Sequence, residues 1–431
     1  MLFAPAWHKE KCQVRCPTRR IYFSSLNHSA VLMNDTNDAL MAPADLFMPS
    51  GAGDSSAPPQ EAPSVRRLDL RFTGSGSEYF RIWIVNLLLT LVTLTLYWPF
   101  ARARRLVYFH RNTLLGTDAL GFHADPWKMF RGYLLMLALG GVYWGVSRFV
   151  PALKWLPLLV MAALWPLLWR SSLFFRLSNT SWRGVRFGFA GSVGMAYRVM
   201  LPLLLPMMLL VLAGSFVEAP DLAQKSWIQT FFVLTGGLTV VFLLGLPWLM
   251  ARLSAYQHSG YVFTRERSSL ETKQIIGGLY LIGLKIFGIA LLLVLLAGLL
   301  AAAAGAGAGK SGVLVILGLF YVVIPLVLLP YFQARVQNLL WGQTRSEQIE
   351  IHSELHFTDL FKVNALNWLL IVVTLGLYWP FAAVRTARVR LQALAVEVHG
   401  DVDTWVAEAP QRPGGVLGDA AGDALGLDMG L

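Results

Sequence analysis

The sequence predicts a mainly α-helical integral membrane protein, and three observations support this fold class. The chain of 431 residues is 55% hydrophobic and only 14% charged, whereas soluble domains carry about 25% charged residues. The apolar residues gather into about eight long segments. The linkers between these segments show the alternation of strands, which predicts a small β layer beside a helical bundle.

The eight apolar segments lie near 82–100, 132–149, 153–169, 199–217, 228–250, 278–304, 313–332 and 363–382. Most of them reach the roughly 20 residues that a helix needs to cross a bilayer. We expect helices because lipid leaves every backbone amide to be satisfied within its own segment.

The linkers differ in length and in charge. The short linkers 148–154, 218–227 and 305–312 hold four basic residues, and the long linkers 101–131, 170–198, 250–277 and 333–362 hold eighteen. Cytoplasmic loops are enriched in Lys and Arg. The long linkers are therefore predicted to face the cytoplasm.

Period-two alternation recurs in the long linkers and at both ends of the folded region. The segments are 67–72, 184–189, 260–274 in two short halves around "TRERSS", 348–357 and 394–405. A lone hairpin is only marginally stable. We therefore expect these strands to pair with one another in one cytoplasmic β layer.

Composition divides the chain into three parts. Residues 1–65 and 409–431 are predicted to be disordered tails, because residues 34–65 are rich in Asn, Asp, Ser, Ala and Pro and the C-terminal residues are similarly polar and glycine-rich. Residues 66–408 are predicted to form the polytopic membrane domain.

Two units near the ends of this domain, 78–105 and 359–386, are almost the same. Between 80–104 and 361–385, 14 of 25 positions are identical, including all of "YWPFA". Apolar composition alone does not match Asn, Thr, Tyr and Pro at one register, so we interpret the units as an internal duplication. Each unit either spans the membrane or re-enters it, with a break near "TLTL" or "TLGL".

Two sets of residues are candidates for function. The polar residues within apolar segments are expected to form hydrogen bonds between helices or to line a polar cavity; they are Asn86, Asn367, Thr93, Thr374 and Lys285. A proline followed by an arginine recurs at the start of each long linker and predicts interfacial anchoring. The anchors are Pro99, Arg104, Arg170, Arg252, Arg335, Pro380 and Arg385.

The segment 80–135, from "FRIWIVNLLL" to "FRGYLL", and the later phrase "NWLLIVVTLGLYWPFAAVR" resemble the YjgN family of polytopic bacterial inner-membrane proteins. The resemblance covers about 68–405. It implies an inner-membrane location in Gram-negative bacteria and no established activity.

The sequence contains no recognisable catalytic motif, and no enzyme activity, cofactor or metal is expected. Glu350, His352, Glu354 and His356 alternate along one strand, but residues two apart on a strand lie too far apart for all four to bind one ion. We expect membrane lipids, and a protein at the β layer, as partners, and no nucleic acid. A non-enzymatic scaffold that binds lipid or a partner is the preferred function. The alternative is a transporter or channel with a polar path between the duplicated units.

Overall fold

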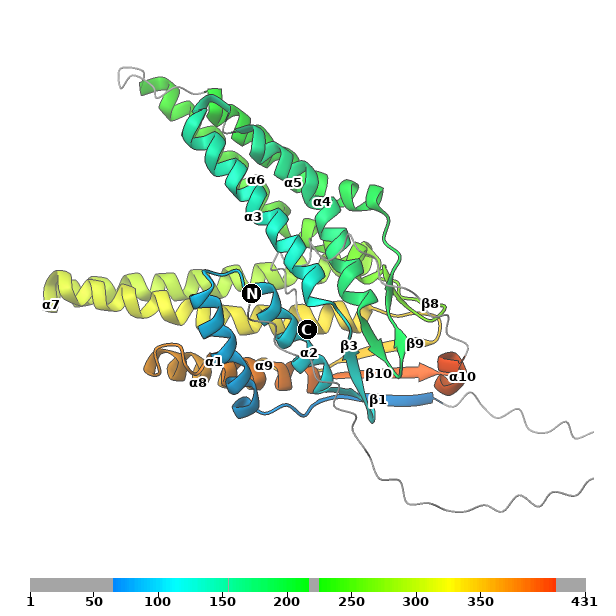
Figure 1. Ribbon diagram of the computed structural model, residues 1–431. Coiled ribbons are helices and arrows are strands. Elements are labelled where there is room, and N and C mark those ends of the chain that lie inside the picture. The colour runs from blue at the N-terminus through cyan, green and yellow to red at the C-terminus, as the bar shows by residue number, and fades with distance from the viewer. Residues whose placement is uncertain (1–64, 154, 217–224, 408–431) are drawn as a thin grey trace, which may run out of the picture. The chain divides into compact units, whose positions relative to one another are not determined.

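The computed structural model describes residues 65–153, 155–216 and 225–407. The predicted tails lie outside this range, apart from Val65. Helices dominate the described part (Figure 1). They are α1 (Gly76–Val92), α2 (Trp98–Arg111), α3 (Pro126–Phe149), η1 (Pro151–Leu153), α4 (Trp155–Ser178), α5 (Val193–Phe216), α6 (Lys225–His258), α7 (Thr272–Gln343), α8 (Phe357–Val373), α9 (Trp379–Gln392) and α10 (Val402–Ala407).

Four of the described helical segments are long and apolar enough to cross a membrane: Pro126–Phe149, Pro151–Ser178, Thr235–His258 and Thr272–Gln343. The last of these, α7, is a hairpin of two antiparallel helices (Figure 1). It breaks at Gly309, where φ is +64°. The break falls inside the predicted linker 305–312, and glycine is the residue that adopts this conformation at little cost.

The strands come from all four long linkers and from both ends of the domain, as predicted. They are β1 (Val65–Phe72), β2 (Thr113–Leu115), β3 (Asp118–Phe122), β4 (Thr180–Trp182), β5 (Val185–Arg186), β6 (Gly188–Phe189), β7 (Tyr261–Phe263), β8 (Glu266–Arg267), β9 (Ile349–Ser353) and β10 (Leu394–His399).

These strands form a nearly continuous ring. One sheet has the order β5-β4-β3-β2-β1-β10-β9, and a second has the order β6-β7-β8. Only Phe187 separates β5 from β6. On the other side, Arg345 bridges both Ser269, just after β8, and Glu350 in β9. The backbone pairing therefore follows chain order around the ring and returns from β10 to β1. We call this the strand ring.

Each pair of helical arms leaves the strand ring and returns beside its starting point. The strands that flank α1 and α2 pair with each other, and so do those that flank α3 and α4, α5 and α6, and α8 and α9. The residues that flank α7, Ser269 and Arg345, also pair. Five helical hairpins, numbered here in chain order, thus begin and end on one ring in the described part of the chain.

The interior of the strand ring is apolar. Leu68, Trp182 and Val398 are its buried centre, and Phe187, Phe263, Val396 and Trp405 are among the side chains that pack against them. These residues come from strands far apart in sequence and from α10. Burial of this cluster favours closure of the ring, because burying apolar surface is the dominant stabilising term.

Four strand predictions were wrong in part. β8 lies within "TRERSS" rather than after it, because α7 already begins at Thr272, and β9 ends at Ser353 because α8 begins at Phe357.

Residues 184–189 form two strands, and Phe187 packs into the strand ring while Phe189 packs against helices α4, α5 and α6. Residues 402–405 belong to α10 rather than to a strand, because Gly400 (φ +127°) turns the chain after β10. The turn lets Trp405 return to the ring.

Several helices also extend further than the apolar segments that predicted them. Helix α4 continues to Ser178, α6 to His258 and α7 to Gln343. Polar side chains satisfy carbonyl groups in the last turns: Thr113, Thr180 and Thr344 each donate a hydrogen bond to the carbonyl four residues earlier, at 2.7–2.8 Å. The long linkers are consequently shorter than predicted, and their first halves are helical.

Candidate lipid-anchoring site

The turn between α1 and α2 satisfies its own backbone amides. Thr93 is the C-cap residue of α1, and Leu94 and Thr95 after it have positive φ angles of 48° and 73°. The N–H groups of residues 93, 94, 95, 96 and 98 each donate to a carbonyl group between residues 89 and 95, in the last turn of α1 or in the turn itself. The N–H of Tyr97 donates to the hydroxyl of Thr93 at 3.0 Å. No amide from 93 to 98 needs water, which is the requirement for backbone placed in hydrocarbon.

The turn between α8 and α9 repeats this arrangement. The hydroxyl of Thr374 accepts the N–H of Tyr378 at 3.0 Å and donates to the carbonyl of Leu370 at 2.6 Å. The other amides from 374 to 379 donate to carbonyls of the same hairpin. Leu375 and Gly376 take the positive φ angles. The predicted break near "TLTL" and "TLGL" is thus the tip of a helical hairpin, and the threonines hold that tip.

Both tips expose large apolar side chains. Leu94 is 84% exposed and Leu375 is 93% exposed, and the neighbouring Trp98 and Trp379 are about half exposed. Such exposure is typical of a surface that faces lipid or a partner rather than water.

Asn86 and Asn367 are buried, as expected of amides that find partners in protein. Asn86 donates to the carbonyl of Ala101 at 3.5 Å and accepts from Arg104 at 3.4 Å. Asn367 donates to the carbonyl of Ala382 at 3.4 Å and to Thr386 at 3.3 Å. Each amide therefore finds partners within its own hairpin. These contacts are those expected of two separate hydrogen-bonded pairs rather than of one shared polar path.

In the second arm of each hairpin, the arginine predicted as an anchor lies over an aromatic ring, and in α2 Arg105 also lies over Phe109 at 5.8 Å. We call the five predicted side chains the anchor arginines. Their guanidinium-to-ring distances are 5.6 Å for Arg104 and Tyr97, 5.2 Å for Arg170 and Phe174, 4.9 Å for Arg252 and Trp248, 5.6 Å for Arg335 and Tyr331, and 5.5 Å for Arg385 and Tyr378. The ring face attracts the cation and holds it in a defined position.

The first arms of four hairpins carry a matching set of basic residues that are not among the predicted anchors. Arg81, Arg131, Arg198 and Lys362 each follow the last residue of a strand by nine positions and are exposed. The anchor arginines precede the next paired residue by nine or ten positions. The constant number of residues between the strand and the basic residue could have identified this set in the sequence, but only if the ends of the strands had been known.

Lys285 lies in the first arm of α7 and is exposed. The register of this hairpin follows from two close approaches, between Gly278 and Leu339 and between Gly305 and Val313. It places Lys285 opposite residue 332, about one helical turn from Arg335. Lys285 is therefore close to the anchor level rather than in the middle of the arm.

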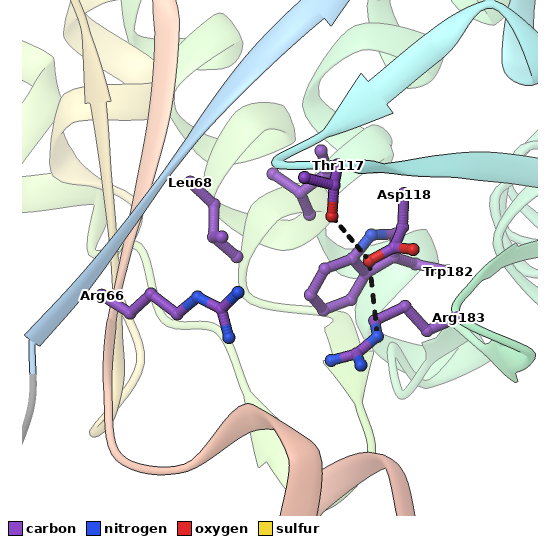
Figure 2. Close-up of a pocket in the computed structure, with 7 residues that line it drawn as sticks. Arg66, Leu68, Thr117, Asp118, Trp182 and Arg183 are labelled. Atoms are coloured by element: carbon purple, nitrogen blue, oxygen red, sulfur yellow. Dashed lines mark hydrogen bonds and ion pairs between the residues drawn. The ribbon is translucent and has the colours of Figure 1, made fainter.

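The mouth of the strand ring carries charged residues (Figure 2). Arg183 forms ion pairs with Asp118 at 3.4 Å and with Asp403 of α10 at 2.6 Å. Together with Arg66 and Trp182, Arg183 and Asp118 line a cavity of about 10 Å³, roughly the space of one water molecule. The cavity is too small for an organic ligand.

The alternating acidic and histidine residues do not converge, since Glu350 and His352 lie in β9 whereas Glu354 and His356 lie beyond its end. His352 instead lies 3.3 Å from Glu397 of β10. Among the residues that the structure describes, no three His, Cys, Asp or Glu side chains are grouped as metal ligands.

Comparison with known proteins places this architecture in a family. The family described as "Bacterial protein of unknown function (DUF898)" matches residues 67–424. The chain belongs to this family. It is also similar to "Inner membrane protein YjgN" of Salmonella typhimurium (strain LT2), with 26% identity over 372 residues, which cover 80% of this chain and 91% of the relative. No solved structure matches.

This match confirms the resemblance to the YjgN family. Together with the membrane-length helices, it establishes a multi-pass protein of the bacterial inner membrane. The DUF898 family description assigns no activity.

Proposed function

We propose that this DUF898 protein is a non-enzymatic membrane scaffold that binds anionic phospholipids around its helical hairpins. The strand ring would lie on the cytoplasmic side, where the long basic linkers are expected. There it would be available to a protein partner. We also infer that hairpins 1 and 5 are copies of one ancestral unit, since their polar contacts recur with a constant offset along the chain.

One observation carries the lipid proposal: a basic residue recurs at nearly the same distance from the strands in both arms of four hairpins and in the second arm of the α7 hairpin. Nine residues of helix correspond to about 13 Å. A guanidinium held over an aromatic ring presents its planar N–H fork to a phosphate, which it can bind through two parallel hydrogen bonds. Anionic headgroups of the cytoplasmic leaflet supply such phosphates.

The charges of the anchors support an anionic ligand. Arg335 and Arg385 are exposed. Among the residues that the structure describes, neither arginine forms an ion pair with a carboxylate. Arg104 contacts only the neutral amide oxygen of Asn86 in its one hydrogen bond to a described residue. These cations keep donors for a phosphate.

Native mass spectrometry of the purified full chain tests the proposal. The probes are phosphatidylglycerol, which is anionic, and phosphatidylcholine, which has no net charge. We expect phosphatidylglycerol to bind several-fold more than phosphatidylcholine, and R104Q/R385Q to lose most of this difference. R148Q/K310Q removes the same charge from the last turn of α3 and from the tip of the α7 hairpin, far from the strand ring, and should change nothing. Equal binding of the two lipids, or equal losses in both double variants, would overturn the proposal.

A further inference from the structure

Hairpins 1 and 5 differ from the others in length. Helices α1 and α2 have 17 and 14 residues, and α8 and α9 have the same lengths. These arms measure about 21–26 Å, and the hydrocarbon core of a bilayer is about 30 Å thick. The first arm of α7 runs from Thr272 to its break at Gly309, about 55 Å. Only the long arms have ample length to reach the opposite face.

Contacts with α3 also limit the reach of hairpin 1. Thr95, at the tip, accepts a hydrogen bond from Tyr133 at 2.9 Å. Phe100, just after the tip, contacts Trp127 and Phe130 with ring centroids 5.1 and 5.6 Å apart. All three partners belong to the first two turns or so of α3. The last residue of α3, Phe149, lies another 16 positions along, or about 24 Å.

The two short hairpins are neighbours. Helix α1 packs against α9, with Phe80 and Phe381 ring centroids 5.7 Å apart. Longer helices flank the pair, because α2 packs against α3 and α8 packs against α7. The short hairpins therefore form one continuous sector of the helical bundle.

We propose that this sector stops within the leaflet nearest the strand ring, so that its tips rest on the acyl chains of the opposite leaflet. Two features of the tips fit acyl chains as the occupant. The backbone amides of both turns are fully hydrogen-bonded within the hairpins, so they need no hydrogen-bond acceptor from the surroundings. The exposed residues Leu94 and Leu375 are apolar, and the tips from 92 to 98 and from 373 to 379 contain no charged residue.

The inference rests on the proposed orientation of the strand ring, and a cysteine scan separates the two. In a background with Cys12 and Cys16 replaced by serine, single cysteines are placed at Leu94, Leu375, Ala190 and Lys310. Ala190 lies between the strand ring and α5, and Lys310 lies at the tip of the α7 hairpin. An impermeant maleimide is added to intact spheroplasts and, separately, to inverted vesicles.

We expect the cysteine at 310 to label from outside, the one at 190 to label from the cytoplasmic side, and those at 94 and 375 to label from neither. Nitroxides at 94 and 375 should then collide with oxygen, which dissolves in lipid, at least several-fold more often than with a water-soluble nickel chelate. Labelling of 94 or 375 from either side, or nickel access equal to that of oxygen, would overturn the half-depth placement. Reversed labelling of 190 and 310 would instead overturn the orientation in the proposed function.

Discussion

The hydroxyl of Thr93 accepts the backbone N–H of Tyr97 at 3.0 Å and donates to the carbonyl of Leu89 at 2.7 Å. One side chain thus closes the tip of hairpin 1. We expect Thr93→Val to destabilise the folded protein by about 1–3 kcal/mol, because it leaves the amide of Tyr97 without a partner. Thermal or denaturant unfolding in detergent micelles measures this change.

Thr90→Val is the matched control for this substitution. The hydroxyl of Thr90 donates to the carbonyl of Asn86 at 2.7 Å, and no backbone amide among the described residues donates to it. Its replacement should cost less than about 0.5 kcal/mol, and Thr93→Ser should retain most of the stability. If Thr90→Val and Thr93→Val cost the same, the hydroxyl of Thr93 does not hold the tip.

The register of β1 and β10 predicts which introduced cysteines can form a disulfide. Arg67 lies opposite Glu397, and side chains directly opposite on one face of an antiparallel pair have Cβ atoms about 4.5–5.5 Å apart. In the background without native cysteines, R67C/E397C should cross-link after mild oxidation of membranes. R66C/E397C should not, because neighbouring residues of a strand point to opposite faces. Cross-linking is read as an electrophoretic mobility shift that reductant reverses. Equal yields for both pairs would contradict the register that closes the ring.

Ionic and apolar contacts hold α10 against the strand ring and should contribute unequally. Asp403 also lies 4.0 Å from Arg66, and Val406 packs against the same apolar cluster as Trp405. Asp403 pairs with Arg183, but its side chain is 59% exposed, and exposed ion pairs contribute about 0–1 kcal/mol. Trp405 packs its partly buried ring against the apolar centre of the strand ring, where each Å² of apolar surface removed from water contributes roughly 25 cal/mol. Amide hydrogen exchange across α10 should therefore accelerate more in Trp405→Ala than in Asp403→Asn. The opposite order would mean that the ion pair, rather than the indole, holds the helix.

Stability at high pH should depend on Tyr261, which follows α6 in β7. Burial raises the pKa of its hydroxyl from 10.0 to about 12, and a hydrogen bond from Gln257 at 2.8 Å opposes this only in part. The folded state thus holds the proton more tightly than the unfolded state. The corresponding stability is complete below pH 10 and is lost as the pH rises towards 12.

We therefore expect Tyr261→Phe to flatten the fall in unfolding temperature between pH 10 and pH 12. If Tyr261→Phe and the wild type lose stability in parallel as the pH rises, Tyr261 does not titrate with unfolding.

The sequence by itself determined the membrane class and the similarity of the two units near the ends of the domain. Apolar length and the scarcity of charge identify helices that lipid requires, because a buried amide has no other partner there. The matched Thr93 and Thr374, Tyr97 and Tyr378, and the prolines that follow indicate one backbone path used twice. These signals are local, so they can be read from neighbouring residues along the chain.

Only the tertiary structure decided what lies at the two ends of each hairpin. Closure of the strand ring joins Arg67 to Glu397 across most of the chain, and pairing at that distance leaves no local pattern. The same holds for the division of Phe187 and Phe189 between two clusters. Alternation predicts a face, whereas the packed partner is set by which strands and helices meet in space. The equal spacing of the basic residues is counted from the ends of the strands. It could therefore be recognised only after the structure had located those ends.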